Sequence, residues 1–200
     1  FFFDTVMQAS RLFALCRPLS YGAGIAVRSY ASLPTPPASL ISSSLNTQLN
    51  QQALREFSAS QEYLSAAQWF EAHDFNGIAA FLQKESDDER KHAIGILEYI
   101  QKRNGETIVP ALPSPSVWGA EATAQSIFDT LYALEVQNGR DLDALYISAG
   151  AEGDPATQVF IADYIKEQTD ATAAMATLNT KVQTYSAFPG LLDHLDKMIG

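Results

Sequence analysis

Four stretches of the sequence repeat apolar residues at alternating spacings of three and four, and polar residues interrupt each repeat near its middle. The stretches span residues 45–70, 78–99, 124–149 and 161–182. This spacing places the repeating residues on one face of an α-helix, as packing in a helical bundle requires. No segment of useful length alternates with a period of two. The pattern therefore predicts an all-α fold built around a four-helix bundle.

The lengths of the connections predict how the four helices are joined. A short turn near His73 and Asp74 connects the first two, and residues 150–154 connect the last two, so each pair should be antiparallel. Residues 105–119, between the second and third helices, contain three prolines and cannot be helical. We therefore expect a long crossover, with the second and third helices running parallel.

Two helix starts can be placed from single residues. Ser44 precedes the first repeat and is a candidate N-cap. Pro189 is expected to open a short fifth helix, because PGLLDHLDKMIG at the C-terminus is again amphipathic.

The polar interruptions share one level of the predicted bundle and would meet inside it. They include several carboxylates, and no Lys or Arg occupies any position of the four repeats. Since an unpaired buried carboxylate costs several kcal/mol, divalent or trivalent metal ions are the remaining counter-charge. Carboxylates with one imidazole and no thiolate suit iron or manganese better than a structural zinc site. The converging residues are Glu56, Glu85, Glu89, His92, Glu135 and Gln168.

The spacing of Glu89 and His92 is that of a metal-binding pair. Residues three apart lie about 60° apart around a helix, so both side chains can reach one ion. Di-iron carboxylate bundles combine such Glu-x-x-His pairs with single glutamates from other helices. Here Glu56 and Glu135 are the single glutamates, and Gln168 replaces a second pair on the fourth helix. Two ions should therefore be bound unequally, with the weaker position beside Gln168.

This combination resembles the non-haem ferritins, especially those of algae and bacteria, over about residues 45–200. The motifs that carry the resemblance are REFSASQEY with Glu56 and Tyr63, KESDDERKHA with Glu89 and His92, YALEVQN with Glu135, and IKEQTD with Gln168.

The resemblance implies ferroxidase chemistry at a di-iron site. Fe(II) is oxidised by dioxygen, with peroxide as a further candidate oxidant, and ferric mineral is stored in a homo-oligomeric shell of 24 subunits. By the same resemblance Glu89 would bridge the two ions, Glu56 and His92 would complete one, and Glu135 the other. Gln168 would bind the second ion or hydrogen-bond one of its oxygen ligands. Tyr63 would donate a hydrogen bond or an electron.

The sequence departs from the ferritin pattern at a third iron site. Many bacterial and algal ferritins carry a further Glu three residues after the glutamine of the fourth helix, where this chain has Ala171 beside Asp170. Glu85 matches the other part of that site, so it remains a candidate ligand.

A second departure concerns iron entry. The acidic pair that lines entry channels in animal ferritins is replaced by Gln158 and Ile161. Asp154 and Asp163 are the remaining candidates for an entry route.

Two other functions remain compatible with such a bundle. One is a different di-iron oxidoreductase, although a rubrerythrin would carry CxxC and this chain has only Cys16. The other is a mainly structural shell subunit, which would be expected to lack the site ligands that are present here.

The first 44 residues differ in composition from the rest. They contain three arginines and a single acid, Asp4, and they end in SLPTPPASLISSS. This composition is typical of a mitochondrial or chloroplast transit peptide, or of a disordered tail in a cytoplasmic protein.

The whole chain has a net charge of -10, which disfavours nucleic-acid binding. No apolar run is long enough to predict a membrane span.

Overall fold

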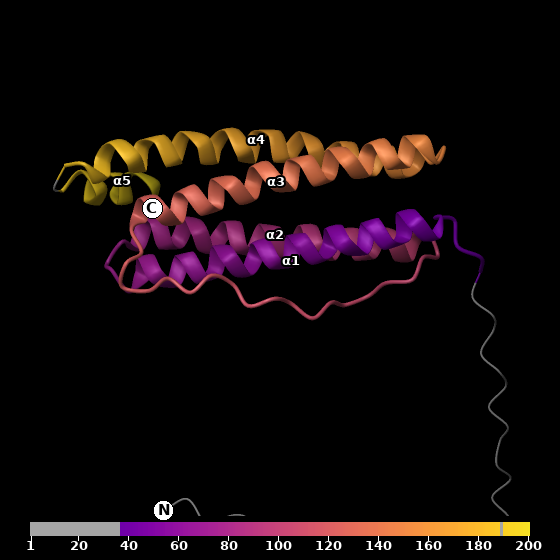
Figure 1. Cartoon of the computed structure of the whole chain (residues 1–200), viewed down its shortest axis with the longest axis horizontal. Helices are drawn as coiled ribbons and strands as arrows, with labels where there is room; N and C mark the ends of the chain where they lie inside the picture. The colour runs from indigo at the N-terminus through magenta and orange to yellow at the C-terminus, as the bar shows by residue number, and fades with distance from the viewer. Residues whose placement is uncertain (1–36, 189) are drawn as a thin grey trace, which may run out of the picture. The chain divides into compact units, whose positions relative to one another are not determined.

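The computed structural model describes residues 37–188 and 190–200. This part of the chain forms five α-helices and no strand (Figure 1). The all-α four-helix bundle with a short fifth helix is thereby confirmed. No helix among the described residues is both long and apolar enough to cross a membrane. The helices are α1 (Ser43–Glu71), α2 (Asn76–Lys102), α3 (Ala124–Ala151), α4 (Pro155–Ser186) and α5 (Leu191–Ile199).

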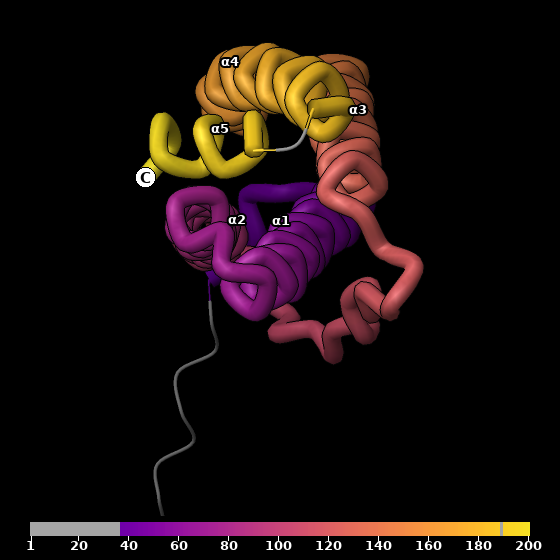
Figure 2. The backbone as a smooth tube through the Cα atoms, turned by 90° about the vertical axis from the view of Figure 1, so that its left-hand side faces the viewer, coloured from indigo at the N-terminus to yellow at the C-terminus, as the bar shows by residue number. Residues whose placement is uncertain are grey.

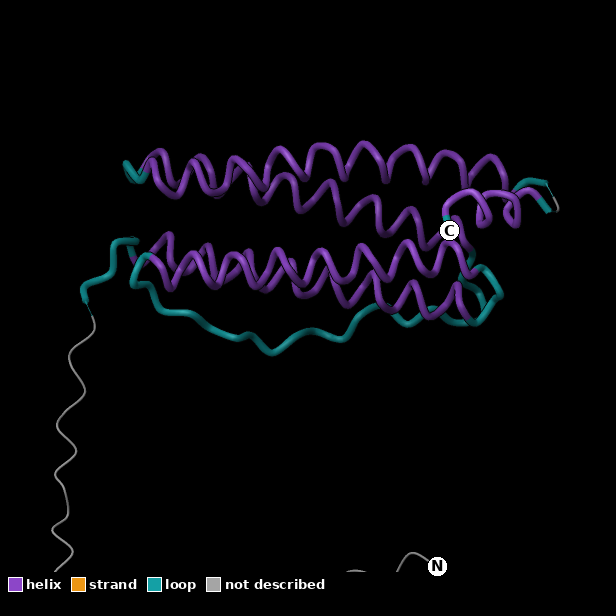
Figure 3. Tube along the Cα trace, turned by 180° about the vertical axis from the view of Figure 1, so that it is seen from behind, coloured by secondary structure: helices purple, strands orange, loops and turns teal. Residues whose placement is uncertain are grey.

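The connections follow the predicted topology. α1 and α2 form one antiparallel pair, α3 and α4 form the other, and the crossover runs back along the bundle from the end of α2 to the start of α3 (Figures 1 and 3). α2 and α3 consequently run parallel. The turn after α1 contains Asp74 with a φ of 65°, and the turn after α3 contains Gly153 with a φ of 71°. A positive φ suits glycine, which has no Cβ to collide with the backbone.

The N-cap of α1 differs from the prediction. Ser42, not Ser44, caps the helix, and its hydroxyl accepts a hydrogen bond of 3.0 Å from the Leu45 N–H. The helix thus begins two residues before the predicted domain boundary at residue 45. The predicted targeting segment lies largely outside the described residues, since the description begins at residue 37.

The apolar core is divided between the two ends of the bundle. One cluster includes Phe70, Ile78 and Phe128, and the other includes Leu49 and Ile96. Full burial of each such side chain contributes about 2 kcal/mol. The polar middle of each repeat lies between these clusters, so the apolar ends hold the four helices together around a polar centre.

α5 completes one end of the bundle, where it contacts α2 and α4 (Figure 2). The Asp196 carboxylate accepts a hydrogen bond of 2.8 Å from the Ile78 N–H, one of the free amides in the first turn of α2. Gly77 is required at this contact, because a Cβ there would lie 2.0 Å from the Asp196 carbonyl oxygen. α5 begins at Leu191, and the predicted opening residue Pro189 lies outside the described residues.

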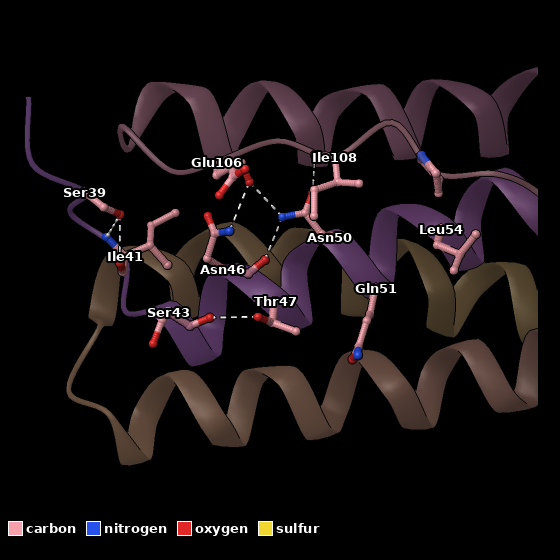
Figure 4. Close-up of a pocket in the computed structure, with 11 residues that line it drawn as sticks. Ser39, Ile41, Ser43, Asn46, Thr47, Asn50, Gln51, Leu54, Glu106 and Ile108 are labelled. Atoms are coloured by element: carbon pink, nitrogen blue, oxygen red, sulfur yellow. Dashed lines mark hydrogen bonds between the residues drawn. The ribbon is translucent and has the colours of Figure 1, made fainter. Parts of the chain in front are cut away.

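The start of the crossover is fastened to α1 by asparagines (Figure 4). Asn50 donates a hydrogen bond of 2.9 Å to the Glu106 carbonyl and accepts one of 2.7 Å from the Ile108 N–H. Asn46 donates a further one of 3.0 Å to the Glu106 carbonyl. A surface cavity of about 530 Å³ lies beside these residues, and none of the predicted site residues lines it.

An ion pair ties together the end of the bundle that lies opposite α5. Arg103, just after α2, donates to both oxygens of Asp154 at 3.2 and 3.1 Å and to the Leu40 carbonyl at 2.6 Å. Asp154 also caps α4 by accepting a hydrogen bond of 3.0 Å from the Thr157 N–H. Partial burial acts to raise the pKa of Asp154, but the hydrogen bonds from Thr157 and Arg103 outweigh it and lower that pKa. The Asp154 carboxylate thus joins the ends of two helices, and a role for Asp154 in iron entry stays a prediction.

We expect Arg103→Ala to lower the free energy of unfolding by about 2–3 kcal/mol, because it leaves the half-buried Asp154 carboxylate without its partner. Chemical denaturation measures the change. Lys102→Ala is the matched control, since Lys102 is exposed and its nearest acid, Glu98, lies 3.9 Å away. Equal effects of the two substitutions would show that the ion pair contributes nothing.

Candidate metal centre

Three predicted ligands from α1 and α2 meet at the polar centre of the bundle. Glu56, Glu89 and His92 each place one ligand atom so that all three atoms lie within 4.8 Å of one another. Glu56 is 1% exposed and Glu89 7% exposed, whereas His92 is half-buried. The Nδ1 atom of His92 lies 3.4 Å from a Glu89 oxygen, as expected for residues one turn apart. Such a group of atoms can hold a single metal ion.

Glu135 on α3 lies beside this group and is held by two other predicted residues. The Tyr63 hydroxyl donates a hydrogen bond to one oxygen of the Glu135 carboxylate, and the Gln168 amide donates to the other. The Gln168 amide also donates to the Glu135 backbone carbonyl at 3.1 Å. Glu135 is 2% exposed, so these two donors replace the water that a carboxylate would otherwise bind.

Two further buried amides, Gln52 and Asn138, lie on the same alternating repeats as Glu56 and Glu135. Gln52 donates to Glu56 at 2.7 Å and to the side-chain oxygen of Asn138 at 2.6 Å. Asn138 in turn donates to the other Glu56 oxygen at 3.2 Å and to Gln168 at 3.0 Å. This chain of hydrogen bonds connects Glu56 with Gln168 and orients both. In the sequence, this network is indicated by amide residues at inward-facing positions of the repeats, because a buried amide needs a hydrogen-bond partner.

Glu167 also contacts the centre, although it lies off the repeat of its helix. One of its oxygens lies 3.3 Å from the His92 Nε2 atom, while the Nδ1 atom faces Glu89. Tyr164, on the same helix, donates to the His92 carbonyl at 3.2 Å. This contact requires Gly95, because a Cβ at that position would lie 2.6 Å from the Tyr164 hydroxyl.

The carboxylates of the centre have raised pKa values because the protein removes them from water. Burial, with the nearby charges of Glu135, Glu85 and Glu167, raises the pKa of Glu89 to about 8. Burial and the neighbouring Glu89 likewise hold the pKa of Glu56 well above its ordinary value. None of the residues buried in the described part of the chain is Lys or Arg. The centre is therefore short of positive charge, which a bound cation would supply.

A cavity of about 310 Å³ leads from the centre to the surface between α2 and α4. Its inner wall contains Glu56, Glu89 and His92, and its outer wall is rich in carboxylates. The acidic residues of the outer wall are Glu85, Asp88, Glu167 and Asp170.

Glu85 occupies the outer part of this cavity without a carboxylate opposite it at position 171. It is half-buried, and burial raises its pKa despite the nearby Lys84. Ala171 lines the same cavity. Asp88 is engaged by Lys84 at 2.9 Å and Lys91 at 2.7 Å. Among these outer carboxylates, Glu85 therefore most resembles the buried ligands, because it is half-buried and its pKa is raised.

A long-crossover four-helix bundle with carboxylates and one histidine at its centre defines the ferritin-like class of proteins. The model of the ferritin-like domain family matches residues 46–184. A bacterial non-heme ferritin of Bacteroides fragilis is 32% identical over 145 residues, which cover 72% of this chain and 89% of the relative. The apo-ferritin structure from Pseudo-nitzschia multiseries has a TM-score of 0.75 at 34% identity, covering 78% of this chain and 99% of that one. The chain belongs to the ferritin family and is a non-haem ferritin.

Proposed function

We propose that this protein is an iron-storage ferritin with ferroxidase activity. The observation that carries the proposal is the buried group of Glu56, Glu89 and His92, whose ligand atoms lie within 4.8 Å of one another. Glu135 completes the group from the other helix pair, and its two hydrogen-bond donors fix its orientation.

The substrate is Fe(II), and each residue of the centre has a defined task. Glu56 and His92 bind one ion, Glu135 binds a second, and Glu89 is shared between them. Gln168 holds Glu135 and offers its amide to an oxygen ligand of the second ion. Two Fe(II) ions give up one electron each, and dioxygen takes both electrons with two protons to form hydrogen peroxide. The excess of carboxylates favours the more highly charged ferric product.

The relatives support iron as the cargo. Several similar crystal structures are of PmFTN variants soaked in iron, and one of them matches this chain with a TM-score of 0.75 at 32% identity.

A third iron bound by Glu85 stays a prediction. Since position 171 offers no carboxylate, we expect that ion to bind more weakly than the other two.

We further propose that the chain assembles into a closed homo-oligomer, with 24 subunits as in the ferritins it resembles. Large apolar side chains are exposed on the crossover and at the α3–α4 end, including Val109, Val117, Ile147 and Val159. Exposed apolar groups of this kind mark surfaces that partner subunits cover.

An organellar location is the corresponding proposal for residues 1–44. A Brassica napus relative described as "Ferritin-1, chloroplastic" is 25% identical over an alignment that covers 98% of this chain. Fusing residues 1–44 to a fluorescent protein tests it. Delivery to chloroplasts or mitochondria is expected, and diffuse cytoplasmic fluorescence would contradict the proposal.

The storage function is tested by adding Fe(II) to the protein in air, following ferric absorbance, and measuring the size of the iron-loaded product by size-exclusion chromatography. We expect oxidation well above the rate in buffer and iron that elutes with a large oligomer. Oxidation at the buffer rate, or a monomer that retains no iron, would contradict the proposal.

Tyr63→Phe should slow Fe(II) oxidation by about tenfold while leaving the fold intact, because Glu135 loses one of its two side-chain donors. Stopped-flow absorbance after mixing with Fe(II) measures the rate. Tyr146→Phe is the matched control, since Tyr146 is 37% exposed on α3 and lies outside the centre. Equal rates for the two variants would show that the Tyr63 hydroxyl has no part in the reaction.

A further inference from the structure

A second cavity approaches the metal centre from another side of the bundle and ends at Gln168. It is a groove of about 450 Å³ between α3 and α4. Gln168 lines both this groove and the acidic cavity, and it is the only residue that the two linings share. Gln168 is 8% exposed and is fixed by Glu135 on one side and Asn138 on the other. The side chain of one glutamine therefore separates the groove from the centre.

The two cavities differ in their chemistry. The acidic cavity carries four carboxylates on its outer wall, Glu85, Asp88, Glu167 and Asp170, against one lysine, Lys84, so it attracts cations. The walls of the groove are mainly apolar or small, with Val136, Ile165, Ala173 and Ala176 among them.

The charged residues of the groove offer a cation no net attraction. They are Arg140 and Asp143, one positive and one negative. An Fe(II) ion would have to shed its water here without gaining a comparable set of ligands, which is costly. A small apolar molecule loses nothing by leaving water for such a surface.

We propose that dioxygen reaches the centre through the α3–α4 groove, past Gln168, while Fe(II) enters through the acidic cavity. This inference rests on the proposed function and adds a separate entrance for the second substrate. Gln168 acts as a positioning residue at the inner end of the groove: it holds Glu135 and separates the entering gas from the cation route.

Two substitutions narrow the groove without replacing any residue of the metal centre. Thr172→Leu adds bulk one turn after Gln168 on the groove wall. Gly139→Ala adds a Cβ that would lie 3.5 Å from the Gln168 Cγ, an ordinary contact, so this variant should fold at least as well as the wild type. Thr177→Leu is the matched control, because Thr177 is exposed on the same helix and does not line the groove.

The test is the initial rate of Fe(II) oxidation at saturating Fe(II) as a function of dissolved dioxygen. Both groove variants should raise the KM for dioxygen severalfold, with the larger rise for Thr172→Leu, while anaerobic Fe(II) binding stays unchanged. The control should match the wild type. If the wild type oxidises Fe(II) and neither groove variant changes the KM for dioxygen, the inference is overturned and the proposed function stands. If the wild type consumes no dioxygen, the proposed function fails and the groove route fails with it.

Discussion

Glu89→Gln is expected to reduce the initial rate of Fe(II) oxidation by about 100-fold or more, since loss even of a residue that only orients a metal ligand costs 10–100-fold. The substitution keeps the size of the side chain but removes the charge shared by the two iron positions. The fold should survive, because a neutral amide is easier to bury than the carboxylate that it replaces. Stopped-flow absorbance in air measures the rate, and circular dichroism confirms the helices.

Asp87→Asn provides the matched control for this substitution. Asp87 lies on the same helix, loses the same charge, and is exposed to solvent. We expect it to oxidise Fe(II) at the wild-type rate. If Glu89→Gln oxidises Fe(II) as fast as Asp87→Asn, the centre described above is not where oxidation takes place.

The iron-free protein should lose several kcal/mol of stability as the pH rises from about 4.5 to about 8. The folded protein raises the pKa of Glu89 from 4.5 to about 8, so in this range the folded state keeps a proton that the unfolded state releases. Each pH unit then favours the unfolded state by up to about 1.4 kcal/mol for this group. Below pH 4.5 both states are protonated, and above pH 8 both are charged, so the contribution of Glu89 no longer changes with pH.

Denaturant titration of the iron-free protein across this range measures the dependence. Glu89→Gln removes one of the titrating groups and should make the curve less steep, while Glu56, whose pKa is also raised, still contributes to the slope. Anaerobic Fe(II) displaces the proton, so its addition at pH 7 should release protons to the solution and restore stability. The stability of the wild type could instead be constant between pH 4.5 and 8, or could rise with pH as steeply as it is expected to fall. Either result would contradict the burial of Glu89.

The helices and the inward set of polar residues could be predicted from the sequence because both depend on helical periodicity. Glu56, Glu89 and Glu135 lie on the same repeats as the core residues and are buried in the structure as that position requires. The exposed face of α2 followed from the same spacing, since Lys84 and Arg90 lie off the repeat and are exposed.

Contacts that depend on side-chain geometry could not be predicted from periodicity. The repeat placed Gln52 and Asn138 inside but could not show that they join Glu56 to Gln168, because an amide can donate in several directions. Glu167 contacts His92 although it lies off the repeat of its helix. Arg103 forms an ion pair with Asp154, which is far from it in the sequence. Pairs of this kind are set by how the helices pack.

The di-iron centre is tested most directly by a crystal of the protein that is soaked anaerobically in Fe(II) and measured at the iron absorption edge. We expect anomalous density for one ion bonded to Glu56, Glu89 and His92, and for a second, weaker one between Glu89 and Glu135. Iron that binds only elsewhere, with these side chains left uncoordinated, would contradict it.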